Sequence, residues 1–261
     1  LVGVKCVLSQ QLECALVRKY PSSDELVNSI AFTSYSFGYD GLDSVKAYES
    51  DKNSSRTACA VKHAQLVNKA GFVVRPTVSS AQAAVRWGAT ELLQNSSCPG
   101  FGFCGNLLDG DDEDVWPITA VTYMLVPLVG SEEEGECRGM RAVRDYVEWI
   151  LTFGDVLRIA GDLQWATMSA RIAQGSLDIL KRMACTRGNA SIPIDQIADF
   201  SPATSVRGSG STMQTRLQHS LSNIYYIQTG VSVHYASVGS GRGMADILAG
   251  AVGFACSESL L

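Results

Sequence analysis

Two glycine-rich turns near the end of the chain carry the residue types best suited to chemistry. Residues 208–212 read GSGST, and residues 239–243 read GSGRG. Glycine lets a backbone approach a bound group closely, and the unpaired N–H groups in the first turn of a helix favour an anion. Because a helix and a strand are expected after each turn, the two turns predict an anion pocket that needs no cationic side chain.

The order of elements over residues 208–261 resembles the opening of the PstS-type phosphate-binding proteins, the two-lobed solute receptors of phosphate uptake. The matching segments are GSGST with its helix, HYASVGSG at residues 234–241 with its helix, and FACSE at residues 254–258. WPIT at residues 116–119 resembles the strand that re-enters the first lobe in that family. The resemblance implies an α/β fold with the two-lobed architecture of type II periplasmic binding proteins.

The resemblance also implies a phosphate site formed by Thr212, Met213, Ser240 and Glu258. Thr212 and Ser240 would each offer a hydroxyl and a backbone N–H group, and Met213 a backbone N–H group alone. The family has Asp where Glu258 stands, and that carboxylate accepts a proton from phosphate and repels sulfate. Glu is one methylene longer, which changes the distance on which this selection depends. Considered alone, Thr212 and Ser240 also suit helix caps, and Glu258 a solvated residue after a strand.

The order of these segments is reversed relative to the family, where the glycine turns come first and the WPIT strand comes near the end. We therefore expect a segment of a longer tandem array, cut so that it joins the end of one unit to the start of the next; a circular permutation is the alternative. Residues 1–114 would be part of a second lobe. Residues 115–184 and 208–261, joined by a linker at 185–207, would form a nearly complete first lobe in swapped order.

The second lobe of the family closes over the ligand with an Arg and a Ser-Gly-Thr turn. No Arg-x-Asp-x-Ser-Gly-Thr segment occurs in this sequence. An Arg and two hydroxyl donors contribute on the order of 4–8 kcal/mol to binding an anion. Without them we expect an affinity at least about a thousandfold lower than that of a complete site, with the missing groups supplied by neighbouring units.

Composition limits the classes of partner and compartment. The formal net charge of −5 argues against a nucleic-acid partner, because no basic stripe is present to bind phosphates. Eight cysteines without a Cys-x-x-Cys pair, together with three scattered histidines, favour disulfides over a zinc site. Sequons at Asn53, Asn95 and Asn189 agree with an extracellular or periplasmic setting for a secreted protein or receptor ectodomain. The longest apolar run, residues 118–129, is too short to span a bilayer.

Hydrophobic periodicity predicts the elements that would position these residues. Helices are expected within residues 1–30, at 81–93, 138–153 and 212–226, and from about residue 160 through 183. A half-buried strand is expected at 30–39, a hairpin at 66–77 and a central buried strand at 116–126. Residues 109–114 hold five acidic side chains in six, which fits a solvated loop or a calcium loop, although the spacing is not that of an EF-hand.

Three functional hypotheses remain at this point. The first is a solute-binding domain for phosphate or a similar oxyanion. The second is a structural or interaction module that kept the fold and lost the ligand, as the departures at Met213 and Glu258 would allow. The third is an enzyme. It has the least support, because no acidic ribose partner follows GSGRG and no Ser/His/Asp order or carboxylate pair is recognisable. We expect neither catalytic residues nor a cofactor.

Overall fold

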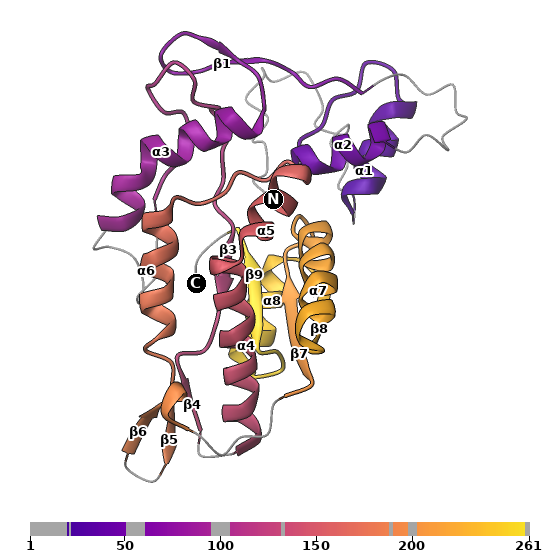
Figure 1. Cartoon of the computed structure of the whole chain (residues 1–261). Coiled ribbons are helices and arrows are strands. Elements are labelled where there is room, and N and C mark those ends of the chain that lie inside the picture. Colours follow the sequence, from indigo (N-terminus) through magenta and orange to yellow (C-terminus); the bar gives the residue numbers. More distant parts are fainter. Residues whose placement is uncertain are drawn as a thin grey trace, which may run out of the picture. The chain divides into compact units, whose positions relative to one another are not determined.

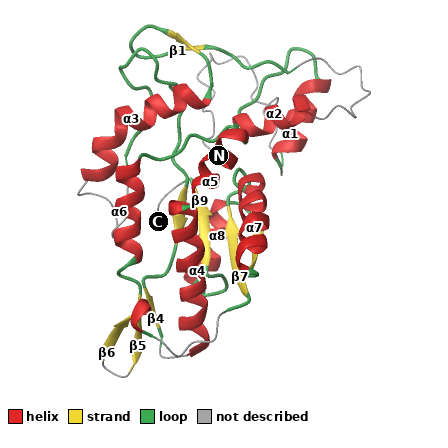
Figure 2. Cartoon of the chain, in the orientation of Figure 1, coloured by secondary structure: helices red, strands yellow, loops and turns green. Residues whose placement is uncertain are grey.

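The chain is a mixed α/β protein that divides into two compact units, residues 1–61 and residues 62–261. The computed structural model describes residues 20, 22–50, 61–94, 105–131, 134–187, 190–197 and 203–258. Figure 1 traces the chain, and Figure 2 distinguishes its helices from its strands. The sequence-based division at residue 114 remains a prediction.

The elements follow one another in a regular order. The helices are α1 (Ser23–Phe32), α2 (Leu42–Ser50), α3 (Val78–Gln94), α4 (Glu134–Thr152), α5 (Gly154–Asp162), α6 (Ala170–Leu180), α7 (Thr215–Thr229) and α8 (Ser240–Leu248). The strands are β1 (Leu66–Val67), β2 (Val73–Val74), β3 (Tyr123–Leu125), β4 (Val129–Gly130), β5 (Ala184–Arg187), β6 (Ala190–Pro193), β7 (Ser205–Gly210), β8 (Ser232–Ser237) and β9 (Phe254–Ser257). A short 3-10 turn covers Ile194–Gln196.

The first unit shows that the strand expected at residues 30–39 is wrong. Helix α1 begins at Ser23, where the Ser22 hydroxyl accepts a hydrogen bond from the Glu25 N–H, and it runs to Phe32. Its buried side chains are Val27 and Ala31, which are spaced for a helix. After it, Tyr35 has φ of 60°, which breaks an extended chain. The alternating aromatic residues therefore lie in an exposed connection.

Several predicted features lie outside the described residues. These are most of the helix expected within residues 1–30, the three sequons at Asn53, Asn95 and Asn189, and five of the eight cysteines: Cys6, Cys14, Cys59, Cys98 and Cys104.

The hairpin predicted at residues 66–77 is confirmed, and so is the helix that follows it. Strands β1 and β2 pair antiparallel, with Leu66 opposite Val74. Asn68 in the turn is buried, and its side-chain amide donates to the carbonyls of Asp112 at 2.9 Å and Val115 at 3.3 Å. Because a buried amide needs partners, Asn68 ties the hairpin to the acidic loop.

A four-stranded sheet, in the order β3-β9-β7-β8, is the centre of the second unit. Strands β7, β8 and β9 are parallel, whereas β3 runs antiparallel to β9. From β7 the chain passes through α7 to β8 on one side, and then through α8 to β9 on the other side of β7. This reversal of direction between β7 and β9 is a topological switch point, where open α/β sheets bind ligands at the carboxyl ends of their strands.

Helices cover both faces of this sheet. Helices α4 and α7 lie on one face, where the Tyr146 hydroxyl donates to the Gln218 side chain at 3.0 Å. Helix α8 lies on the opposite face, where the Ser209 hydroxyl donates to Asp246 at 3.1 Å. Figure 1 shows α4 and α7 in front of β9 and β7, with α8 behind. All four residues of β9 are therefore buried, as is usual for a parallel strand covered on both faces.

The apolar stripe predicted on the helix at residues 138–153 is confirmed as the centre of the core. Met140, Val143 and Val147 of α4 are buried, and Ile150 and Phe153 pack against the same cluster. The largest fully buried side chains include two aromatic rings of this cluster, those of Tyr146 and Phe254.

The segment at residues 116–126 is not the central buried strand that its apolar sequence predicts. Only Tyr123–Leu125 forms a strand, and it is a half-buried edge strand. The earlier part turns instead, because Pro117 has no N–H to give to a ladder and the Thr119 hydroxyl donates back to the Trp116 carbonyl at 3.0 Å.

The expectation of a linker throughout residues 185–207 is also wrong. Strands β5 and β6 form an antiparallel pair there, and β4 joins β5 in parallel to make a three-stranded sheet. Pro193 was taken as a breaker, but it ends the edge strand β6, where a missing N–H costs nothing. The apolar side chains of this segment, Ile192, Ile194 and Ile197, belong to the main core.

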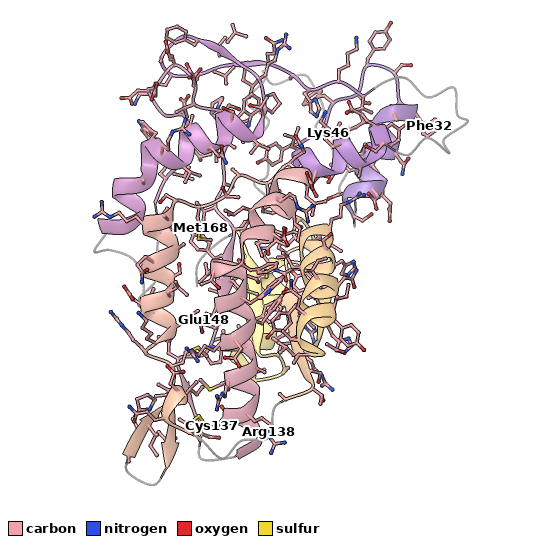
Figure 3. The ribbon with its side chains drawn as sticks, in the orientation of Figure 1. Phe32, Lys46, Cys137, Arg138, Glu148 and Met168 are labelled. Atoms are coloured by element: carbon pink, nitrogen blue, oxygen red, sulfur yellow. A yellow bond between two sulfur atoms is a disulfide. The ribbon has the colours of Figure 1, made fainter. Side chains whose placement is uncertain are left out.

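A disulfide joins helix α4 to this small sheet. It links Cys137 and Cys185, which are 48 residues apart in the sequence (Figure 3). This bond confirms the expectation that cysteines form disulfides for this one pair. No helix within the described ranges is both long and apolar enough to cross a bilayer.

Replacing both bonded cysteines, Cys137→Ala with Cys185→Ala, should lower the free energy of unfolding by about 2–4 kcal/mol. The bond closes a 48-residue loop, so its loss restores conformational entropy to the unfolded chain. Urea unfolding followed by circular dichroism measures the change. Ser191→Ala, on the exposed part of β6, is the control and should change stability by less than about 0.5 kcal/mol. An unchanged urea midpoint in the double variant would contradict the prediction.

Candidate functional site

Three polar side chains meet at the carboxyl ends of the parallel strands. Ser211 directly follows β7, Glu258 directly follows β9, and Ser240 begins α8 after β8. Both serine hydroxyls donate hydrogen bonds to the Glu258 carboxylate, one to each oxygen. The group lies at the switch point between β7 and β9, and we call these three residues the Ser–Glu–Ser cluster.

The backbone of Gly210 brings the β7 and β8 ends together. Its carbonyl accepts hydrogen bonds from the N–H groups of Val238 at 3.0 Å and Gly239 at 2.8 Å, so the second glycine turn is attached to the end of the first strand. Gly210 has φ of 136°, and a Cβ there would overlap the Cys256 carbonyl. Only glycine suits this position.

Two further glycines place α8 against the sheet. Gly239 has φ of 87° and lets the chain turn directly from β8 into the helix. At Gly243 a Cβ would overlap the backbone of Gly210, so helix and strand approach backbone to backbone. This close approach fixes the first turn of α8, and with it Ser240, beside the end of β7.

Ser211 is held at every polar atom. Its N–H donates to the Cys256 carbonyl at 2.9 Å, and its carbonyl accepts from the Tyr235 hydroxyl at 2.8 Å. Its own hydroxyl accepts from the Met213 N–H at 3.2 Å while donating to Glu258. The residue is 1% exposed, so its hydroxyl is preorganised for an anionic acceptor.

Glu258 is partly buried and bridges the two serines. Hydrogen bonds to a charged acceptor are about twice as strong as neutral ones, and a carboxylate at a helix N-terminus is further favoured by the helix dipole. The expectation that Glu258 and Ser240 share one site agrees with this contact, but their predicted role as phosphate ligands remains a prediction.

Thr212 and Met213 are placed differently from Ser240. Helix α7 begins at Thr215, three residues after the expected start, so Thr212 and Met213 form a turn before it. The Thr212 carbonyl accepts from the Thr215 hydroxyl at 2.7 Å, and the Met213 N–H is engaged by Ser211. The structure therefore joins Ser240 and Glu258 to Ser211, a residue that the resemblance did not select. Its signal was its place directly after the GSG turn.

A second polar contact holds α8 on the sheet. The Asp246 carboxylate accepts from the Ser209 hydroxyl and from the Arg242 Nε at 2.7 Å. The hydrogen bond from Arg242 lowers the pKa of Asp246 below its ordinary value of 3.8, with a smaller contribution from Ser209. Because Ser209 lies on β7 next to Gly210, this contact supports the position of Ser240 from the far side.

A buried polar network lies on the other face, beneath the cluster. Gln218 accepts from the Tyr146 hydroxyl, and its amide donates to Gln214 at 3.1 Å and to the Cys256 sulfur at 3.6 Å. Burial raises the pKa of the Cys256 thiol to about 12 and also raises the pKa of Tyr235. Cys256 is therefore a neutral thiol at physiological pH and a poor nucleophile.

The chemistry available at the cluster is anion recognition. Two hydroxyl donors and the first turn of a helix converge where a negatively charged oxygen group is held. Within the described ranges, no group of three or more His, Cys, Asp or Glu side chains is arranged to hold a metal ion. In the acidic loop, Asp111 accepts from the Trp87 indole N–H at 2.7 Å.

Comparisons with known proteins give limited context. No family model matches the chain, and no solved structure matches it. Among curated proteins it is similar to the putative serine/threonine-protein kinase/receptor R826 of Acanthamoeba polyphaga mimivirus, with 21% identity over 125 residues. The match covers 48% of this chain and 7% of that protein. This chain therefore corresponds to a small part of its viral relative.

Asp246→Asn should reduce the acid sensitivity of the protein. The folded-state pKa of Asp246 is lowered, so its contribution to stability is complete above the unfolded value of 3.8 and is lost as pH falls through the folded-state pKa. The wild-type free energy of unfolding should thus fall more steeply below pH 4 than that of the variant. Urea unfolding between pH 7 and pH 2.5 tests this, and parallel pH profiles would contradict it.

Gly243→Ala should lower the free energy of unfolding by about 1–3 kcal/mol, the usual range for forced overpacking. The new methyl group meets the Gly210 backbone, which cannot rotate away as a side chain would. Gly241→Ala is the matched control, because its Cβ would have no neighbour within 4 Å in the same helix. Equal stability of the two variants in thermal and urea unfolding would show that α8 does not pack as described.

Proposed function

We propose that the second unit is a solute-binding module for phosphate or a similar oxyanion. The observation that carries the proposal is the convergence of the Ser211 and Ser240 hydroxyls and the first turn of α8 on one carboxylate at the switch point of the sheet. Donors arranged for a carboxylate also suit the oxygens of a tetrahedral oxyanion.

An acidic protein is compatible with this proposal. The net charge of −5 acts over the whole surface, whereas recognition of a small anion depends on local dipoles and hydrogen bonds. The N-terminal end of α8 supplies such a dipole, and the Ser211 hydroxyl is fixed before any ligand arrives. Little reorganisation is then needed for binding.

The proposal includes the two-lobed architecture of type II periplasmic binding proteins, as the resemblance to the PstS-type proteins implies. In that arrangement the sheet β3-β9-β7-β8 belongs to the first lobe, and a second lobe contributes further donors, including an Arg. Neighbouring units of a tandem array would supply the parts that the sequence lacks. They are therefore the proposed partners of this unit, together with the oxyanion itself.

We place the module in a secreted protein or a receptor ectodomain, where it binds rather than catalyses. The Cys137–Cys185 disulfide supports an oxidising compartment. The name of the similar viral protein, which includes a receptor, agrees with such a setting, although the match covers only 7% of that protein.

A structural or interaction module is the second candidate, and one observation favours it. Glu258 already occupies both serine hydroxyls, and the Met213 N–H is already engaged by Ser211. A chain that satisfies its own donors needs no external anion to be stable. Such a module would use the fold for spacing or contact between units.

Calorimetric titration of phosphate, and then of sulfate, into the 261-residue chain tests the proposed function. We expect weak binding of phosphate, with a Kd in the millimolar range, because the donors of a second lobe are missing. Ser211→Ala and Ser240→Ala should each weaken it by at least about tenfold through loss of one charged hydrogen bond.

Thr212→Ala and Ser232→Ala complete this experiment. Thr212→Ala tests the role that the resemblance implies, and a loss similar to that of Ser240→Ala would support it. Ser232 begins β8 at the opposite edge of the sheet, so its replacement should leave phosphate binding unchanged. A folded protein that binds neither anion up to about tenfold above the expected Kd would reject the oxyanion module and leave the structural one.

A further inference from the structure

Glu258 holds the position that an external oxyanion would need. Each of its carboxylate oxygens accepts from one serine hydroxyl, Oε1 from Ser211 and Oε2 from Ser240. A hydroxyl has one proton to donate. While Glu258 is in place, neither serine can donate to a second anion.

We propose that Glu258 is a built-in competitor for the site, an intramolecular anion that an external oxyanion must displace. This inference rests on the proposed function and deepens it, because it assigns to Glu258 the control of affinity at that same site. It differs from a role as a direct ligand, in which the carboxylate would contact the bound anion and strengthen its binding.

The surroundings determine which partner moves when an anion enters. Ser211 is fixed by its N–H, its carbonyl and its hydroxyl, and it is 1% exposed. Ser240 is fixed by the turn that Gly210 holds. Glu258 is partly exposed and has three rotatable side-chain bonds, so its carboxylate can turn toward water while the serines stay in place.

The backbone at Glu258 limits its alternatives while the sheet is intact. The preceding residue, Ser257, is fully buried and pairs with Tyr123 of β3, so β9 holds the start of the Glu258 side chain beside the cluster. The carboxylate is thus tethered close to the two hydroxyls, at a high effective concentration relative to any free anion. An external anion of moderate affinity will therefore bind weakly while Glu258 is intact.

Removing the competitor should strengthen anion binding. We expect Glu258→Ala to bind both phosphate and sulfate at least tenfold more tightly than the wild type, measured by calorimetry on the whole chain. Glu258→Gln keeps the shape without the charge, so it should strengthen binding by a smaller factor. It also decides the question should the alanine variant fail to fold.

Anion-dependent stability provides a second readout. In chloride buffer the Glu258→Ala variant should unfold at a lower temperature than the wild type, because α8 loses the carboxylate at its N-terminus. Millimolar phosphate or sulfate should raise its unfolding temperature, and should raise that of the wild type less. Glu136→Gln is the matched control, because Glu136 also accepts a hydrogen bond from a serine hydroxyl, that of Ser131, away from the cluster.

The outcomes separate this inference from the proposed function. Tighter binding of both anions in the Glu258 variants, with Glu136→Gln equal to the wild type, supports both. Equal or weaker phosphate binding in the Glu258 variants, with measurable binding in the wild type, overturns the competitor role and leaves the oxyanion module standing. No anion binding in the wild type or in any folded variant rejects both.

Discussion

The backbone at Gly210 is where the parts of the second unit meet. Its carbonyl holds the β8–α8 turn, its Cα lies against Gly243 of α8, and its neighbour Ser211 continues the ladder to β9 through the Cys256 carbonyl. A side chain at this position would separate all three segments. The close approach therefore controls how far apart the carboxyl ends of the strands lie, and hence whether one carboxylate can reach both serines.

The Ser–Glu–Ser cluster follows from that spacing. A switch point leaves a gap between the connections that depart from β7 and β9, and helix N–H groups and hydroxyls point toward it. Such donors need an acceptor when they are partly buried. In this chain the acceptor is Glu258, and the same geometry therefore serves both an oxyanion module and a self-satisfied structural module. What distinguishes the two is the cost of moving one side chain, because the rest of the cluster is already fixed.

Local patterns predicted much of the fold. The α4 stripe, the hairpin at β1 and β2, helix α3 and the alternation of strands and helices after residue 204 depend on periodicity and glycine turns, which act over a few residues. The errors at residues 30–39, 116–126 and 185–197 have a different cause. There the apolar or aromatic pattern suits several structures, and long-range contacts decide, such as the pairing of β3 with β9 at the sheet edge. Of the cluster, Ser240 and Glu258 were selected from the resemblance. Ser211 was not, because its role depends on Glu258, which is 47 residues away in the sequence.

The surroundings of the cluster determine which charges an incoming anion meets. Burial keeps Cys256 and Tyr235 neutral, so the groups next to Ser211 contribute dipoles and no further negative charge. Asp246 is ionised, but Arg242 pairs with it along α8. Glu258 is therefore the carboxylate whose charge acts directly on the two serine hydroxyls. A single titratable side chain that can rotate is a simple way to set the affinity of an anion site, because it changes the occupancy of the donors without moving the sheet or its helices.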